Sequence, residues 1–187
     1  MHYCIHVFTV NFPSNNQLRE ILNPFEEEAF YSDEDFEKER PAFLWDCWRI
    51  GGRYGGSLKL KVQTEKDDEY RWNYYMRDGE QREGRLFYSR LLEMIRDKFP
   101  YYEAREEDWV NYMGDGTYLY VDGGKIKDLV NVDEIGCFGF VDIDGTAYAR
   151  EFWTGDNWEK HDDFDNRYQE TLKNRSDCFL TIIDIHN

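Results

Sequence analysis

Apolar and polar residues alternate along several short segments of the chain, a pattern that is typical of strands. The alternation predicts strands over residues 3–10, 42–50 and 57–62, and an aromatic run over 70–76 suggests another. Residues 178–185 are apolar at most positions, which favours a strand at the centre of a sheet.

In other segments the apolar residues recur every three or four positions, which is typical of helices. Residues 86–99 carry the widest such stripe, and a helix beginning near residue 158 would place Phe164, Tyr168 and Leu172 on one face. A short helix is expected after Ser14, and residues 103–113 form a further candidate.

Glycine and aspartate at the breaks between these segments predict three hairpins. The first joins 42–50 to 57–62, the second lies within 117–130, and the third lies within 137–153. The order of elements predicts an α+β fold, with a mainly antiparallel sheet covered by two or three helices. At this length we expect one domain over residues 1–187.

The charge of the chain narrows the choice of partners. The 39 acidic and 23 basic side chains give a formal net charge of −16, which repels nucleic acids and anionic membranes. The expected partner is therefore an anionic small molecule held at a local cationic site, or a basic protein. Assembly into a homo-oligomer stays open.

The remaining composition indicates a cytoplasmic protein with no cofactor. The four cysteines are scattered without a CxxC pair, which favours reduced thiols and predicts no metal site. No apolar run approaches the roughly 20 residues of a membrane span, and no signal peptide is visible. Aromatic residues make up 18% of the chain, more than the core needs, so some are expected at a binding surface.

The segment Trp45–Gly56 is the most distinctive in the chain, with two glycine pairs around one arginine and one tyrosine. Glycine amides can form a nest for an anion, Arg53 presents a planar fork of donors, and indole rings stack on flat ligands. The alternative is a twisted hairpin with both tryptophans in the core and Arg53 paired with Asp46.

Asp184 and His186 lie two residues apart on the last predicted strand and therefore face the same side. His2 and His6 on the first strand would join them if the two terminal strands pair. Such a group resembles an acid–base pair or a metal site, and the alternative is a purely structural carboxylate. The candidate ligand-binding residues are Trp45, Trp48, Gly51, Gly52, Arg53, Tyr54, Gly55, Asp184 and His186.

The run from Trp45 to Gly56 resembles W-D-[WY]-[WY]-x-x-G-G-R-[WY]-x-G segments of uncharacterised phage and bacterial proteins. Asp122-Gly123-Gly124-Lys125, Gly136-Cys137-Phe138-Gly139 and Asp184-Ile185-His186 are similar to their D-G-x-W, G-W-[WF]-G and D-x-H motifs, so the resemblance spans residues 40–187. It implies no known activity. It does imply a phage-type origin and a shared pocket for Arg53 and the Asp184/His186 pair.

These observations predict a non-enzymatic protein that captures an anionic or nucleotide-like ligand, and a phage protein of this kind could sequester a host defence signal. Two other functions stay open. Residues 26–40 are strongly acidic and suit an inhibitor that mimics nucleic acid on a basic protein surface. A hydrolase using Asp184 and His186 is the third possibility.

Overall fold

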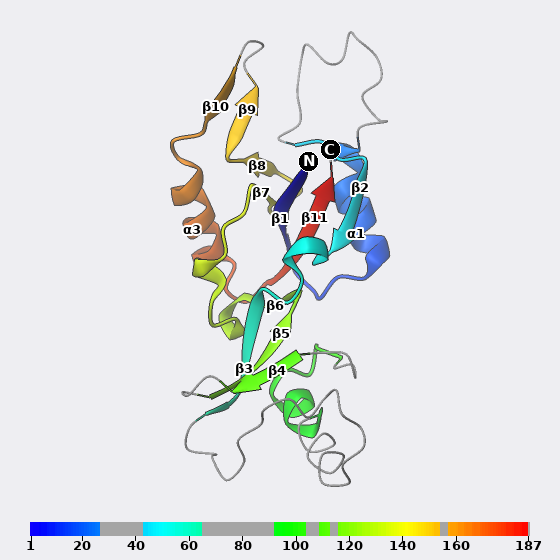
Figure 1. Cartoon of the computed structure of the whole chain (residues 1–187), viewed down its shortest axis with the longest axis vertical. Coiled ribbons are helices and arrows are strands. Elements are labelled where there is room, and N and C mark those ends of the chain that lie inside the picture. The colour runs from blue at the N-terminus through cyan, green and yellow to red at the C-terminus, as the bar shows by residue number, and fades with distance from the viewer. Residues whose placement is uncertain (27–42, 65–91, 104–108, 113–115, 154–156, 187) are drawn as a thin grey trace.

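The computed structural model describes residues 1–26, 43–64, 92–103, 109–112, 116–153 and 157–186 (Figure 1). The strands and longer helices are β1 (His2–Thr9), α1 (Asn15–Leu22), β2 (Cys47–Ile50), β3 (Leu58–Thr64), β4 (Trp109–Tyr112), β5 (Gly116–Val121), β6 (Gly123–Lys125), β7 (Gly139–Val141), β8 (Ala147–Ala149), β9 (Glu151–Trp153), β10 (Trp158–Lys160), α3 (Phe164–Asn174) and β11 (Phe179–His186). Residues 92–98 are also helical, and short 3₁₀ helices cover Asn23–Phe25, Gly52–Tyr54, Ile126–Asp128 and Val132–Glu134.

The fold is α+β, and its main sheet is built around the two terminal strands. The strand order is β2-β11-β1-β7-β8, and β6 also pairs with β11. β1 and β11 run antiparallel with His2 opposite His186, so the two ends of the described chain lie side by side (Figure 1). β7 runs parallel to β1, which makes the sheet mixed, although its other pairs are antiparallel as expected.

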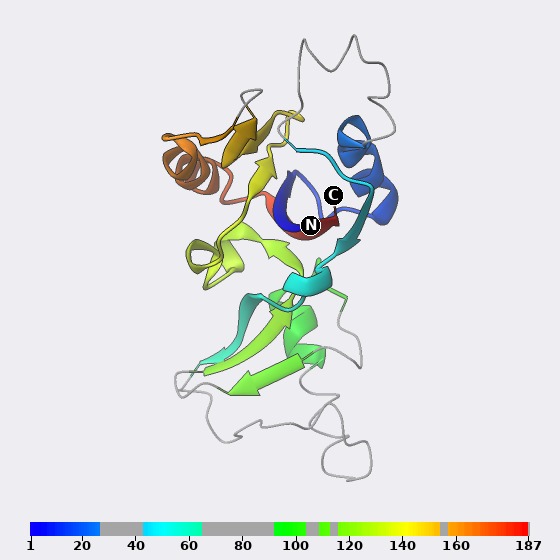
Figure 2. The same ribbon diagram turned by 45° about the horizontal axis from the view of Figure 1, so that its top comes forward.

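Each face of the main sheet has its own apolar cluster because side chains alternate along β1 and β11. On one face, Phe8 and Ile182 pack in the larger cluster with the buried stripe of α3. On the other face, Ile5 and Ile183 pack with Leu18 of α1. The two helices therefore lie on opposite faces of the sheet (Figure 2).

A second sheet has the strand order β3-β5-β4, and its buried residues Leu60 and Leu119 continue the larger cluster. β4 corrects the helix expected over 103–113. Trp109, Val110 and Tyr112 are residue types with high strand propensity, and the segment pairs antiparallel with β5.

Two of the three predicted hairpins are wrong. β2 pairs with β11 while β3 pairs with β5, so residues 51–57 pass from the main sheet to the second sheet instead of closing a hairpin. β5 and β6 diverge in the same way, because β6 pairs with β11. Local turn signals favour a reversal at both places, but burial of each strand against a different sheet decides the pairing.

The third hairpin is confirmed by the antiparallel β7–β8 pair. The helix after Ser14 is also confirmed, since the Ser14 side chain accepts the Gln17 amide and the Gln17 side chain accepts the Ser14 amide. Within the predicted helix 86–99 only the last part is described, and the candidate strand 70–76 lies outside the described residues. None of the described helices is long and apolar enough to cross a bilayer.

Candidate functional site

The glycine-rich corner after β2 does bind anions, and they are carboxylates of the protein itself. The backbone N–H of Arg53 donates to Asp184 Oδ2 at 2.9 Å, and the N–H of Gly56 donates to Asp122 Oδ1 at 2.7 Å. Gly55 closes the 3₁₀ turn by donating to the Gly52 carbonyl at 3.3 Å.

Glycine is required at this corner because the two carboxylates press against the backbone. A Cβ on Gly51 would lie 2.5 Å from Asp122 Oδ1, and one on Gly52 would lie 2.4 Å from Asp184 Oδ2. Both glycines also have positive φ, at 66° and 51°. The nest expected for an external anion is therefore filled by internal side chains.

Asp184 is almost fully buried yet remains an acceptor of two hydrogen bonds. Although burial opposes ionisation, the Arg53 amide and the His2 imidazole lower the pKa of the Asp184 carboxyl below its usual value. Asp184 thus anchors the corner to the end of the main sheet.

The two large side chains of the corner, Arg53 and Tyr54, differ in burial. Arg53 is exposed, and among the described residues its guanidinium has no hydrogen bond or ion pair, so the predicted alternative of pairing with Asp46 is wrong. Tyr54 is half-buried against the larger cluster, and its hydroxyl donates to the His2 carbonyl at 3.3 Å.

The terminal strands bring two histidine–carboxylate pairs together. His2 Nδ1 lies 2.9 Å from Asp184 Oδ1, and His186 Nδ1 lies 3.0 Å from both oxygens of Asp46. The two rings meet edge to face with centroids 4.9 Å apart. Asp184 and His186 share a face of the sheet, as the spacing predicts, but each contacts a different partner.

His6 does not join this group. It lies deeper in β1, fully buried, with Nδ1 2.6 Å from the Tyr168 hydroxyl. At the surface, Asp46 pairs with His186 instead. The sequence did not predict this pair because the two residues are 140 positions apart. The only available signal was the conditional pairing of the terminal strands, which the structure confirms.

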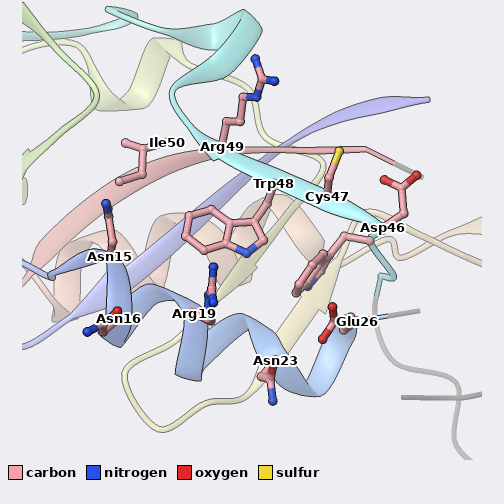
Figure 3. Close-up of a pocket in the computed structure, with 11 residues that line it drawn as sticks. Asn15, Asn16, Arg19, Asn23, Glu26, Asp46, Cys47, Trp48, Arg49 and Ile50 are labelled. Carbon is pink, nitrogen blue, oxygen red and sulfur yellow. The ribbon is translucent and has the colours of Figure 1, made fainter. Parts of the chain in front are cut away.

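A groove of about 700 Å³ lies between α1 and β2 (Figure 3). Its lining consists of Asn15, Asn16, Arg19, Asn23, Glu26, Trp45, Asp46, Cys47, Trp48, Arg49 and Ile50. Trp48 is half-buried and extends from β2 toward α1, whereas Cys47 and Arg49 point to the other side of the strand (Figure 3). The two predicted tryptophans therefore reach a pocket, but the remaining candidates do not line it.

Of the two arginines that line the groove, Arg19 is the one on the same side of β2 as the Trp48 indole (Figure 3). Its side chain rises from α1 toward the Trp48 indole, and among the described residues the guanidinium has no hydrogen bond or ion pair (Figure 3). Asn15 and Asn16 lie at one end of the groove, and the acidic Glu26 and Asp46 lie at the other. The cationic and amide groups are thus separated from the carboxylates.

Trp45 lines the groove but is itself 5% exposed, and its Nε1 donates to the Leu22 carbonyl at 2.9 Å. It therefore fixes α1 against β2, and Trp48 offers the accessible ring. Sequence reasoning selected Trp48 but missed Arg19, because Arg19 reaches the groove only once α1 packs on the face of the main sheet toward which Trp48 of β2 points.

Comparisons with protein-family models, with curated proteins and with solved structures found no match. The resemblance of residues 40–187 to phage and bacterial proteins therefore stays a prediction.

Proposed function

We propose that this protein is a non-enzymatic binding protein that captures a small anionic, nucleotide-like ligand in the groove between α1 and β2. The supporting observation is the accessible Trp48 indole facing the Arg19 guanidinium across the groove. A planar ring stacks on the indole while its anionic group binds the guanidinium, and these are the two features that define a nucleotide.

The size and lining of the groove fit this class of ligand. Ligand sites usually enclose about 300 to 1,000 Å³, and this groove has about 700 Å³. Asn15, Asn16 and Asn23 present amides, which both donate and accept hydrogen bonds and therefore suit the polar edge of a base or a sugar.

The arginine that binds the anion is then Arg19, and not Arg53 as the sequence predicts. Arg53 was the candidate, but the amides around it already hold Asp184 and Asp122. Within the described part of the chain Arg19 has no ion pair, and the net charge is −16, so Arg19 gives a local attraction for an anion within a repelling surface. For a phage protein, the corresponding role would be sequestration of a host nucleotide signal.

Thermal unfolding with a panel of mononucleotides, cyclic nucleotides and nucleosides tests the proposal. A ligand at 100 times its Kd stabilises a protein by about 2.7 kcal/mol. We expect stabilisation by anionic nucleotides and not by the uncharged nucleosides. Arg19→Gln should abolish it, and Trp48→Ala should weaken binding about fivefold to 150-fold, because a stacked base contributes about 1–3 kcal/mol.

Arg53→Gln is the matched control, since Arg53 is also exposed but lies outside the lining of the groove. It should bind as the unaltered chain does. Loss of binding in Arg53→Gln with retention in Arg19→Gln would return the site to the glycine corner and overturn the proposal. An absence of stabilisation by every nucleotide at millimolar concentration would also overturn it.

Among the described residues, no comparable observation supports either of the two alternative functions. Of the acidic segment 26–40 only Glu26 is described, so the inhibitor hypothesis falls largely outside the described residues. The hydrolase hypothesis needs a pair between Asp184 and His186, and the hydrogen bonds of these residues go to His2 and Asp46 instead.

A further inference from the structure

Three side chains with different donor atoms converge at the edge of the main sheet, outside the proposed contact between Trp48 and Arg19. One carboxylate oxygen of Asp46, Sγ of Cys47 and one ring nitrogen of His186 all lie within 4.8 Å of one another. We propose that these three residues bind one divalent transition-metal ion of the zinc class. This site goes beyond the proposed function and does not depend on it.

Backbone pairing fixes the relative positions of the three residues. Cys47 opens the edge strand β2 and lies opposite His186 in the β2–β11 register. The Asp46 N–H also donates to the His186 carbonyl at 2.9 Å. The donor atoms are therefore set on a sheet, which positions a site more reproducibly than a loop does.

The spacing of the donor atoms is close to that of a tetrahedral metal site. Bonds of about 2.0–2.3 Å from zinc to nitrogen, oxygen and sulfur place the ligand atoms roughly 3.3–3.6 Å apart. His186 Nδ1 lies 3.0 Å from both Asp46 oxygens, and the whole group spans no more than 4.8 Å. The separation of His186 and Asp46 therefore differs from the tetrahedral spacing by only a few tenths of an ångström.

A hydrogen bond now holds two of the three groups together where a cation would. Asp46 accepts from His186 at 3.0 Å, and the Cys47 thiol lies within 4.8 Å of both donor atoms. An ion coordinated by all three takes the place of the proton between His186 and Asp46, which moves to the other ring nitrogen or to solvent. The thiol proton leaves to solvent as the thiolate binds.

The chemistry of the donors selects the metal. Thiolate and imidazole are ligands of zinc and similar transition metals, whereas magnesium and calcium require oxygen ligands. Asp46 and Cys47 are both exposed, so the fourth position is open to water or to a further ligand. Three protein ligands with one open position are typical of sites that bind or activate another molecule.

A second layer of contacts restricts the histidine ligand. The His2 ring meets the His186 ring at 4.9 Å between centroids, and His2 is held in turn by the buried Asp184. Asp184 itself accepts the Arg53 amide of the glycine corner. This chain of contacts limits the rotation of His186, a role that outer groups commonly play around metal ligands.

Titration of the full-length reduced chain with Co²⁺ tests the proposal, because a thiolate bound to cobalt gives a charge-transfer absorption band that carboxylate and imidazole do not give. We expect one Co²⁺ per chain, the band, and displacement of the cobalt by Zn²⁺. Cys47→Ser should lose the band. Asp46→Asn and His186→Ala should each bind Co²⁺ at least about tenfold more weakly, since loss of an outer partner of a metal ligand already costs about tenfold to 100-fold.

Cys178→Ser and His161→Ala are matched controls, since each removes the same side-chain type outside the cluster. Both should bind cobalt as the unaltered chain does. Retention of the band in Cys47→Ser, its loss in Cys178→Ser, or no cobalt binding by the unaltered folded chain would each overturn the proposal. Cobalt binding should persist in Arg19→Gln, which removes no ligand of the proposed metal site, so this test and that of the groove fail independently.

Discussion

Replacing Gly52 with alanine places a methyl group directly against the Asp184 carboxylate. The added Cβ would lie 2.4 Å from both Cβ and Oδ2 of Asp184, at a backbone φ of 51°. Gly56 has a similar φ of 67°, but among the described residues its added Cβ would meet only Tyr120 Cβ at 3.6 Å, which is ordinary contact. No atom of the described segments lies within 4 Å of a Cβ added at Gly136. The three positions therefore separate backbone strain from steric conflict.

The expected losses follow from these contacts. A left-handed backbone costs a non-glycine residue about 1–2 kcal/mol, offset by about 0.4–1 kcal/mol from the stiffer unfolded chain. Gly56→Ala should therefore lose roughly 0.5–1 kcal/mol. Gly52→Ala carries the same strain and must also displace Asp184 from the Arg53 amide and His2. Overpacking and a weakened charged hydrogen bond add about 2–3 kcal/mol, for a total near 3 kcal/mol.

Urea unfolding followed by tryptophan fluorescence measures all three variants by linear extrapolation. Gly136→Ala should stay within about 0.5 kcal/mol of the unaltered chain, since only the unfolded state changes. If Gly52→Ala loses no more stability than Gly56→Ala, then the Asp184 carboxylate does not sit in the corner, and the structural role of these glycines is refuted.

Two further predictions concern the core and the first helix. Burial lowers the pKa of His6 from 6.5 to about 3, so the unfolded chain gains a proton that the folded chain excludes as the pH falls below 6.5. We compare the free energy of unfolding in urea at pH 7.5 and at pH 5.0. Its fall between the two pH values should be about 2 kcal/mol smaller in His6→Phe than in the unaltered chain. The same fall in both chains would contradict a neutral buried imidazole. Ser14→Ala removes the acceptor of the Gln17 amide in the capping box of α1, so thermal or urea unfolding should show a loss of about 1 kcal/mol. Ser14→Asp, which keeps a capping oxygen, should recover most of that loss.

The local pattern of the sequence was sufficient for most individual elements. The alternation at residues 3–10 and the apolar run at 178–185 match β1 and β11, and the spacing of Phe164, Tyr168 and Leu172 matches the buried face of α3. These predictions succeed because a helix or strand that buries one face repeats its apolar residues with its own period. The same reasoning failed for Trp109–Tyr112, where pairing with β5 outweighs the acidic, helix-compatible residues before it.

The partners of the candidate site residues required the tertiary structure. The glycine cluster was recognisable as an anion nest. Its anions are Asp184 on β11 and Asp122 between β5 and β6, and both follow the cluster by more than 60 residues along the chain. His186 meets Asp46 instead of Asp184 because β2 pairs with β11 and not with β3. Strand pairing is set by the apolar area that a whole sheet buries, which no local segment encodes.

The sequence by itself therefore determined the types of chemistry present near Trp45–Gly56 and at the C-terminal strand: an indole, a guanidinium, a nest of amides and histidines beside carboxylates. The tertiary structure decided which of them meet. It filled the nest with internal carboxylates, set Trp48 opposite Arg19 of α1, and set Cys47 beside His186. The physical reason is that residue types and periods are local properties, whereas neighbours across a sheet follow from packing both of its faces at once.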